Sequence, residues 1–167
     1  MKVLILGANG TVGGEVKNVL LNQTDYGLVY YSRHVDRFTN LTEQEEVKIG
    51  DIFDARALHE AMEGIDVIFA SLSGDLPKMA RNIIEAMNGA GVKRIIFISS
   101  MGIYNEIPAS IGSEGNVSRN SVLIKYRDSA EIIENSGLNY TIIRPGWFDW
   151  GSNEYEITRK GEPFGGH

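Results

Sequence analysis

The chain has 167 residues, a net charge of −6 and no cysteine. This length suits one domain with a full hydrophobic core and leaves little room for a separate substrate domain. The acidic balance argues against nucleic acid or an anionic membrane as the main partner, and the lack of cysteine excludes disulfides, a thiol nucleophile and a cysteine-ligated metal. Because no segment has the pattern of a signal peptide or a membrane span, we expect a soluble cytoplasmic protein.

Three glycines follow the first predicted strand, residues 3–6, and open a helical pattern. They stand three residues apart, a spacing that differs from the common G-x-G-x-x-G fingerprint. Glycine lets the chain turn sharply after the strand and lets a pyrophosphate approach the backbone. The free N–H groups at the start of the helix then face the anion. A tight turn without a ligand is the simpler alternative. The predicted phosphate site consists of Gly7, Asn9, Gly10, Thr11, Val12 and Gly13.

Apolar strand-like segments alternate with helical segments along the rest of the chain. Asp75 and Pro77 mark a helix start, Gly91 marks its end, and a loop rich in Gly, Ser and Asn is expected at about 101–120. Repeated βα units with apolar strands predict an α/β fold, a doubly wound parallel sheet (Rossmann fold), with the ligand at the carboxyl ends of the strands. Strands are predicted at 28–31, 47–49, 67–70, 94–98 and 140–143, and helices at 55–62, at 76 to about 90 and at about 122–135.

The residues that follow the strands supply candidate cofactor contacts. After the second strand, Ser32 and Arg33 offer a hydroxyl and a guanidinium where NAD-preferring domains usually carry a carboxylate. These groups suit the 2′-phosphate of NADP, although a solvated loop arginine is the alternative. After the third strand, Asp51 could accept a hydrogen bond from the adenine amino group, whereas Asp54 suits a helix cap. We therefore expect NADP, with NAD as the alternative, and contacts from Ser32, Arg33, Asp51, Ile52, Ala70, Ser71 and Leu72.

Several longer segments carry a resemblance to a known family. GANGTVGG, GDIFD, ISSMGIY, KYRDSAEIIENSGLNY and TIIRPGWF occur in this order over about residues 1–150. In these segments the chain resembles the atypical short-chain dehydrogenase/reductases, an NAD(P)H-binding group that includes NmrA-like regulators and small flavin or quinone reductases. The resemblance implies a Rossmann domain that binds NAD(P)H, with further cofactor contacts from Arg144 and Pro145 after the last strand and active-site positions at Ser99 and Ser100.

Tyr126 is the candidate catalytic tyrosine, but it lacks the usual lysine partner. Active members of the wider superfamily use Tyr-x-x-x-Lys, and here Ala130 takes the lysine position. Lys125 is expected to project away from Tyr126 on the helix. Without a nearby cation, Tyr126 is a poor general base. It could still donate a proton or a hydrogen bond to a carbonyl, or be a structural residue. Ser99 and Ser100 either orient a substrate carbonyl or complete the strand end.

The end of the chain, residues 145–167, shows no convincing helix or strand. Such a long irregular segment is uncommon in a compact domain, and the family pattern continues with a further strand and helix that wall the substrate pocket. We therefore expect residues 1–167 to form a single NAD(P)-binding domain that lacks the usual C-terminal elements. Residues 145–167 would begin a truncated or reduced substrate-binding region.

Two functions from different classes stay open. The first is NADPH-dependent reduction of a small carbonyl, a quinone or a flavin, because hydride transfer to a quinone or flavin needs no strong protein base. The second is a non-catalytic NADP(H)-binding sensor, which the missing Tyr-Lys pair favours. An epimerase or dehydratase is third, since those enzymes usually need the intact pair. The expected partners are the dinucleotide and a small-molecule substrate, the scattered histidines predict no metal site, and the oligomeric state stays open.

Overall fold

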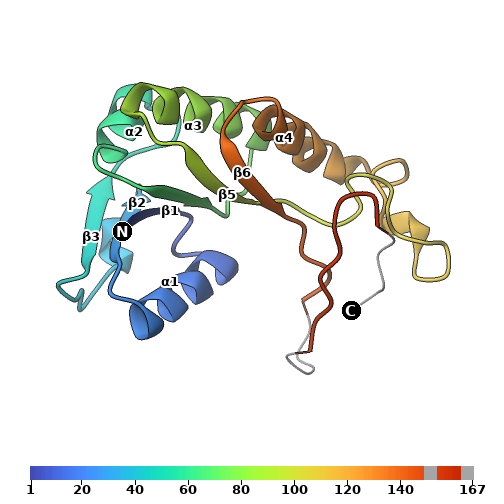
Figure 1. The fold of residues 1–167 in the computed structure, drawn as a ribbon, viewed down its shortest axis with the longest axis horizontal. Helices are drawn as coiled ribbons and strands as arrows, with labels where there is room; N and C mark the ends of the chain where they lie inside the picture. Colours follow the sequence, from blue (N-terminus) through green and yellow to red (C-terminus); the bar gives the residue numbers. More distant parts are fainter. Residues whose placement is uncertain (149–153, 163–167) are drawn as a thin grey trace.

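The computed structural model describes residues 1–148 and 154–162. Six parallel strands form one sheet in the order β3-β2-β1-β4-β5-β6 (Figure 1). Because this order reverses at β1, the sheet has the switch point at which open parallel sheets bind ligands. The predicted Rossmann fold is confirmed. The strands are β1 (Lys2–Leu6), β2 (Gly27–Ser32), β3 (Glu45–Ile49), β4 (Val67–Ala70), β5 (Arg94–Ile98) and β6 (Asn139–Ile143).

Helices cover both faces of the sheet unequally. α1 (Thr11–Gln23) lies on one face, and α2 (Ala55–Ala61), α3 (Leu76–Ala90) and α4 (Ile124–Glu134) lie on the other (Figure 1). Short 3₁₀ turns occur at η1 (Val35–Arg37), η2 (Ser113–Gly115) and η3 (Ser121–Leu123). The predicted helix at about 122–135 is therefore split into η3 and α4.

The helix ends follow the predicted capping residues. The Asp54 carboxylate accepts a hydrogen bond from the N–H of Ala57 at 3.0 Å, and the Asp75 carboxylate accepts one from the N–H of Lys78 at 3.3 Å. Such side-chain acceptors satisfy N–H groups that have no partner within the helix. Gly91, in the left-handed conformation at φ 76°, ends α3 as predicted.

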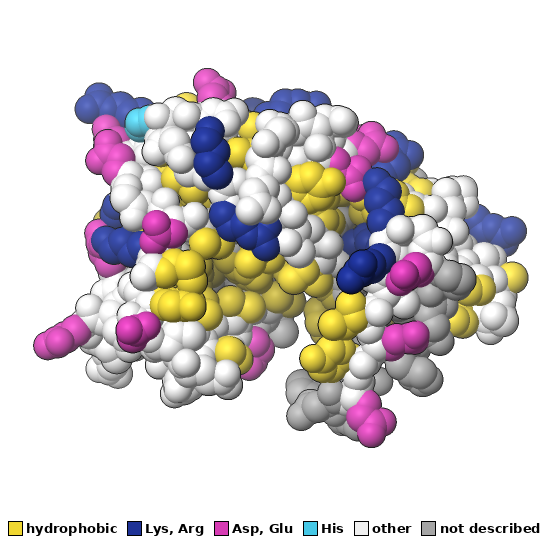
Figure 2. Space-filling view, in the orientation of Figure 1, with side chains coloured by type: hydrophobic (Ala, Val, Ile, Leu, Met, Phe, Trp, Pro, Cys, Tyr) yellow, Lys and Arg dark blue, Asp and Glu magenta, His cyan; other side chains and the backbone are white. Residues whose placement is uncertain are grey.

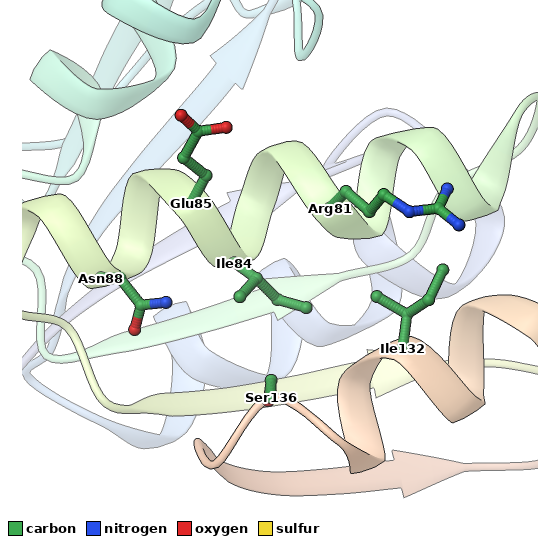
Figure 3. A pocket seen from close by; sticks show the side chains of 6 residues that line it. All are labelled: Arg81, Ile84, Glu85, Asn88, Ile132 and Ser136. Carbon is green, nitrogen blue, oxygen red and sulfur yellow. The ribbon is translucent and has the colours of Figure 1, made fainter.

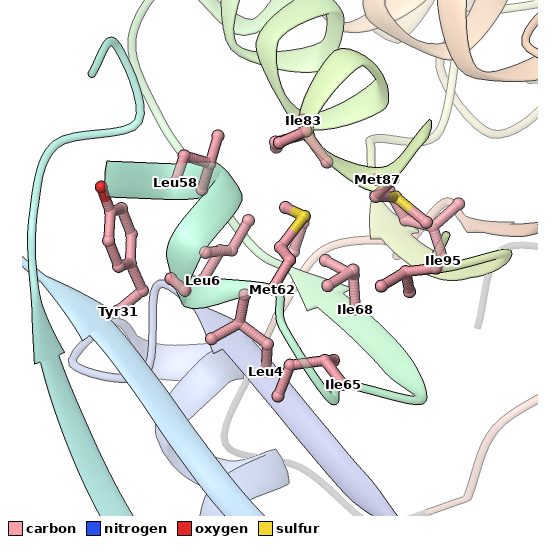
Figure 4. Packing of buried hydrophobic residues seen from close by; sticks show 14 of the residues in the cluster. Leu4, Leu6, Tyr31, Leu58, Met62, Ile65, Ile68, Ile83, Met87 and Ile95 are labelled. Carbon is pink, nitrogen blue, oxygen red and sulfur yellow. The ribbon is translucent and has the colours of Figure 1, made fainter. Parts of the chain in front are cut away.

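Two hydrophobic clusters pack against the two faces of the sheet. The larger cluster fills the space between the sheet and α2 and α3, and includes Leu4, Leu6, Leu58, Met62 and Ile68 (Figure 4). The smaller cluster lies on the α1 side and includes Val3, Ile5, Leu28, Tyr30 and Phe69. Successive residues of β1 thus enter opposite clusters, which explains its unbroken apolar sequence. The glycine turn follows a strand that is held on both faces.

The α1 face is open over β5 and β6 within the described residues. Ile96 and Ile98 are partly buried there, and Ile143 at the end of β6 is 42% exposed. The described residues of 145–167 contain no helix or strand, and 149–153 and 163–167 lie outside the described part of the chain. Among the described helices, none has the length and apolar character needed to cross a membrane.

Candidate functional site

The glycine turn after β1 contains two glycines that the fold itself requires. Gly7 has φ +95°, and a Cβ there would lie 2.0 Å from the carbonyl oxygen of Ser71. A Cβ on Gly13 would lie 2.1 Å from the Gly7 oxygen. Gly10 differs, because its φ of −81° is ordinary and its Cβ would come no closer than 3.3 Å to a neighbour. The turn therefore needs Gly7 and Gly13, while a Cβ on Gly10 would make one tight contact, with the Gly7 oxygen, at the start of α1.

The start of α1 is suited to an anion. Gly10 is its N-cap residue, no side chain caps the helix, and its first turn contains no acidic residue. The first N–H groups of a helix lack intrahelical acceptors and carry the positive end of the helix dipole. An uncapped helix start behind a glycine turn is the arrangement that binds a pyrophosphate. The residues present thus fit the phosphates of a dinucleotide.

The predicted adenosine contacts lie together at the ends of β2 and β3, where Ser32 pairs with Ile49. Nη1 of Arg33 is 3.6 Å from Oδ2 of Asp51, and both side chains are largely exposed. The buried Tyr31 ring fixes this corner, because its hydroxyl donates to the Asp51 carbonyl oxygen at 2.9 Å. Burial, and then the nearby carboxylates, raise the pKa of Tyr31 to about 12. Tyr31 therefore stays a hydrogen-bond donor at neutral pH.

A pocket of about 390 Å³ opens where β4, β5 and β6 end beside α1. Figure 2 shows hydrophobic side chains gathered in the recess between α1 and the segment after β6. The lining contains hydroxyl and apolar side chains but no charged residue among those described. It comprises Val12, Ser71, Leu72, Ile98, Ser99, Ser100, Val122, Leu123, Tyr126, Pro145, Gly146 and Phe148. Residues predicted separately from five segments thus meet in one pocket.

The two serines after β5 have different surroundings. Ser99 is 6% exposed, and its hydroxyl donates to the backbone oxygen of Tyr126 at 3.3 Å. This bond ties the end of β5 to α4. The Ser100 side chain lines the same pocket and makes no hydrogen bond to any residue in the described part of the chain. Ser100 is therefore the serine whose hydroxyl is free for a ligand.

Tyr126 lies in the pocket wall, and the side chain of Lys125 lies beside it. Nζ of Lys125 lies over the Tyr126 ring, 5.5 Å from its centroid. The expectation that Lys125 projects away from Tyr126 is wrong, because its long aliphatic stem folds back across the helix surface. A cation over an aromatic face attracts the ring weakly, by about 0.5–1 kcal/mol at exposed sites. Ala130, at the usual lysine position, is fully buried.

Comparison with known proteins identifies the family. A family model described as NAD(P)H-binding matches residues 7–167. The chain belongs to this NAD(P)H-binding family. A Rossmann-fold NAD(P)-binding family protein from Shigella flexneri is 34% identical, with a TM-score of 0.80 over 98% of this chain and 76% of that chain. A short-chain dehydrogenase/reductase from Veillonella parvula, solved in complex with NADP, is 25% identical, with a TM-score of 0.84 over 98% of this chain and 78% of that chain.

Curated relatives of this NAD(P)H-binding domain include reductases. The NAD(P)H azoreductase of Xenophilus azovorans is 26% identical over 149 residues, which cover 87% of this chain and 48% of that protein. An uncharacterized chloroplastic protein of Arabidopsis thaliana is 30% identical over 87% of this chain and 53% of its own length. The domain thus spans about half the length of these two relatives. The resemblance to the atypical short-chain dehydrogenase/reductases is confirmed.

Arg144 of the NAD(P)H-binding domain does not line the pocket. Its Nη1 lies 2.6 Å from Oε1 of Glu106, and the two side chains are only 12% and 9% exposed. The guanidinium that we expected to contact the cofactor is thus engaged with a carboxylate. Sequence reasoning missed Glu106, because it lies in the irregular 101–120 segment with no periodic or motif signal. Pro145, the next residue, does line the pocket.

A second hollow of about 420 Å³ lies between α3 and α4 (Figure 3). Ile84 and Ile132 form its apolar part, and Arg81 and Glu85 flank it. Asn88 and Ser136, its other lining residues, lie toward the C-terminal ends of the two helices, which lead into the starts of β5 and β6. This groove is therefore on the helix layer, away from the carboxyl ends of the strands and from the glycine turn. Although this groove is slightly larger than the pocket beside α1, its position away from the glycine turn argues against it as the cofactor site.

Proposed function

We propose that this protein is an NADPH-dependent reductase of an uncharged unsaturated acceptor, namely a small carbonyl, a quinone or a flavin. The observation that carries the proposal is the pocket beside the start of α1, whose described lining has hydroxyl groups and apolar surface but no charge. A pocket without a cation offers nothing to hold a carboxylate or phosphate on the substrate. It suits an acceptor that binds by its apolar face and is oriented by a few hydrogen bonds.

Different residues around the pocket would contact different parts of the cofactor. The glycine turn and the α1 start would hold the pyrophosphate. Arg33 and Ser32 would hold the 2′-phosphate, and Asp51 and Ile52 would border the adenine. Ala70, Ser71 and Leu72 would line the path toward the nicotinamide. When bound there, the nicotinamide supplies the hydride.

The protein would act on the acceptor by orientation. Ser100 and Tyr126 line the pocket, so the hydroxyl of either would be able to donate a hydrogen bond to an acceptor oxygen. Such donors stabilise the charge that develops on oxygen as the hydride arrives. A strong base is not needed for this step, which agrees with alanine at position 130. Two curated relatives, an azoreductase and a quinone oxidoreductase, are named for reactions of the same kind.

A non-catalytic NADP(H) sensor is the second candidate. Ala130 stands where a lysine would activate Tyr126, and its complete burial leaves no space for a lysine there. In such a protein the cofactor would bind at the same glycine turn without being consumed. The two functions therefore differ in turnover and not in cofactor affinity.

Steady-state oxidation of NADPH against a panel of acceptors tests the proposal. A quinone and its sulfonated analogue make a matched pair, because they differ in charge and share the reacting ring. We expect turnover with the uncharged quinone and a kcat/KM lower by at least about tenfold for the sulfonated one, about 1.4 kcal/mol in the barrier. Equal kcat/KM for the two quinones would show that the lack of charge in the described lining does not select the acceptor. Absence of turnover with every acceptor, with NADPH still bound, would favour the sensor.

A further inference from the structure

The Glu106 carboxylate joins two walls of the pocket. Its Oε1 accepts hydrogen bonds from Arg144 Nη1 at 2.6 Å and from the Gly102 N–H at 3.0 Å, and its Oε2 accepts from the Tyr104 N–H at 2.9 Å. Its side chain is only 9% exposed. A carboxylate this deeply buried is stable only when it is paired and hydrogen-bonded. All three partners come from the segments that follow β5 and β6.

These partners adjoin residues that line the pocket. Gly102 lies two positions after Ser100, and Arg144 immediately precedes Pro145. A second contact, from the Met101 N–H to the Pro145 oxygen at 3.1 Å, joins the same two segments. Gly102 has φ +81°, and a Cβ there would lie 2.1 Å from the Gly115 oxygen, so the turn is closely packed. The ion pair is thus placed to set the separation of the two walls.

Tyr104 extends this network to the helix that carries Tyr126. The Arg144 guanidinium lies over the Tyr104 ring, 5.0 Å from its centroid. The Tyr104 hydroxyl donates to Glu134, the last residue of α4, at 2.5 Å. Lys160 binds both Glu134 oxygens at 2.8 and 2.9 Å. The end of β6, the loop after β5 and α4 are therefore connected through side chains that do not line the pocket.

We propose that Glu106 is a positioning residue for hydride transfer, and that with Arg144 it holds the Ser99–Ser100 wall at a fixed distance from the Pro145–Gly146 wall. The proposal rests on the proposed function. A displacement of about 1 Å in a reacting geometry costs about a hundredfold in rate. Loss of the Glu106 charge leaves the Arg144 guanidinium without its counter-ion, so the two walls lose this side-chain connection and depend more on the backbone bond from the Met101 N–H to the Pro145 oxygen. The effect should appear in the chemical step, because the glycine turn that holds the pyrophosphate is untouched.

The test compares Glu106→Gln with Glu45→Gln. Glu45 is a matched control, since it also accepts hydrogen bonds from a tyrosine hydroxyl, at 2.6 Å, and from a backbone N–H, at 2.9 Å, but it lies on β3 at the opposite edge of the sheet. We expect Glu106→Gln to lower kcat by at least about tenfold and to change the NADPH dissociation constant by less than about threefold. Glu45→Gln should change neither. Glu106→Asp keeps the charge and should recover part of the lost kcat. If Glu106→Gln does not fold, the kcat of Glu106→Asp is compared directly with that of the unaltered protein.

Fluorescence of bound NADPH separates this proposal from the proposed function. If the unaltered protein oxidises no NADPH, the proposed function fails, yet nicotinamide emission still reports the pocket walls. We then expect Glu106→Gln to bind NADPH with emission close to that of the free cofactor, whereas Glu45→Gln keeps the emission of the unaltered protein. Unchanged kcat and unchanged emission in both Glu106 variants would overturn the positioning role, whatever their melting temperatures.

Discussion

The three glycines of the turn after β1 differ in how closely the backbone packs against them. Gly7 and Gly13 approach backbone atoms so closely that a Cβ would overlap them, whereas a Cβ on Gly10 would make one tight contact, 3.3 Å from the Gly7 oxygen. The G-x-x-G-x-x-G spacing predicted a phosphate site but could not distinguish the three glycines, because the close approaches are made to the Ser71 and Gly7 backbones across the turn. The structure shows that, of the three, Gly10 is the position where a Cβ would come least close to the neighbouring backbone.

Gly10→Val should abolish NADP(H) binding in a folded protein. The valine side chain would occupy the space beside the start of α1 that the pyrophosphate needs. Gly13→Ala should instead destabilise the fold, because its Cβ would meet the Gly7 oxygen at 2.1 Å. Gly14→Ala is the neutral control, with its nearest neighbour at 3.6 Å. Calorimetric titration and thermal melts measure both effects. Unchanged NADPH affinity in folded Gly10→Val would place the site elsewhere.

Arg33→Ala should reduce the preference for NADP(H) over NAD(H). A charge-assisted hydrogen bond contributes about 1.5–3 kcal/mol. The Arg33 side chain is 68% exposed and pairs with the Asp51 carboxylate, so we expect a contribution near the lower end of this range. We expect a preference of at least about tenfold in the unaltered protein, mostly lost in the variant, with NAD(H) affinity barely changed. Arg56→Ala, with a side chain 89% exposed on α2, is the control. Equal binding of both cofactors by the unaltered protein would contradict a role for Arg33.

Tyr126→Phe should lower kcat by less than about tenfold, under roughly 1.4 kcal/mol in the barrier. The tyrosine has no lysine at position 130, and the Lys125 ammonium lies over its ring. Its hydroxyl is therefore expected to orient the acceptor and not to abstract a proton. Steady-state kinetics with a quinone measures the loss. A fall of several thousandfold would show instead that Tyr126 is an acid–base residue and that Lys125 supplies the missing cation.

At the scale of elements, local signals predicted the regular structure and tertiary contacts decided the rest. Capping aspartates and apolar runs placed the strands and helices to within a few residues, because these signals act over one or two turns of chain. The 101–120 segment was predicted only as a loop. Its order comes from contacts between distant residues, such as the buried Asn116 amide, which pairs with both backbone groups of Ile107 at 3.0 and 2.8 Å. No local pattern encodes such a pairing, and Glu106 was missed for the same reason.

The C-terminal end of α4 should be sensitive to acid through Glu134. Burial alone would raise the pKa of Glu134, but hydrogen bonds from Lys160 and Tyr104 outweigh burial and hold the pKa below its ordinary value. Because the pKa is lower in the folded state, the contact stabilises fully above the unfolded pKa of about 4.3 and is lost as the pH falls through the folded pKa.

Glu134→Gln should therefore lower the melting temperature at neutral pH, by an amount that corresponds to about 1 kcal/mol. The difference from the unaltered protein should shrink below about pH 4. Thermal melts across this range measure it, with Glu60→Gln on the exposed face of α2 as the control. A difference that stays constant with pH would show that the Glu134 charge is not what stabilises this end of the helix.

At the scale of the whole molecule, the sheet brings the glycine turn, the Arg33–Asp51 pair and the pocket, whose described lining is uncharged, to one edge. The sequence predicted this gathering, because all six strands are parallel and their carboxyl ends meet. It could not predict that the described residues of the pocket lining carry no charge, which depends on side chains such as Arg144 turning away to Glu106. That feature supports a reductase of an uncharged acceptor more directly than any motif does.

A single-turnover experiment tests this account most directly. The protein is loaded with an equal amount of NADPH and mixed with an uncharged quinone, and the nicotinamide absorbance is followed with time, with Gly10→Val as the control. We expect the bound NADPH to be fully oxidised, an equal amount of quinone to be reduced, and Gly10→Val to show only the rate of free NADPH. Persistence of the bound NADPH at the protein-free rate, in a protein that binds it tightly, would contradict the account and identify a cofactor-binding sensor.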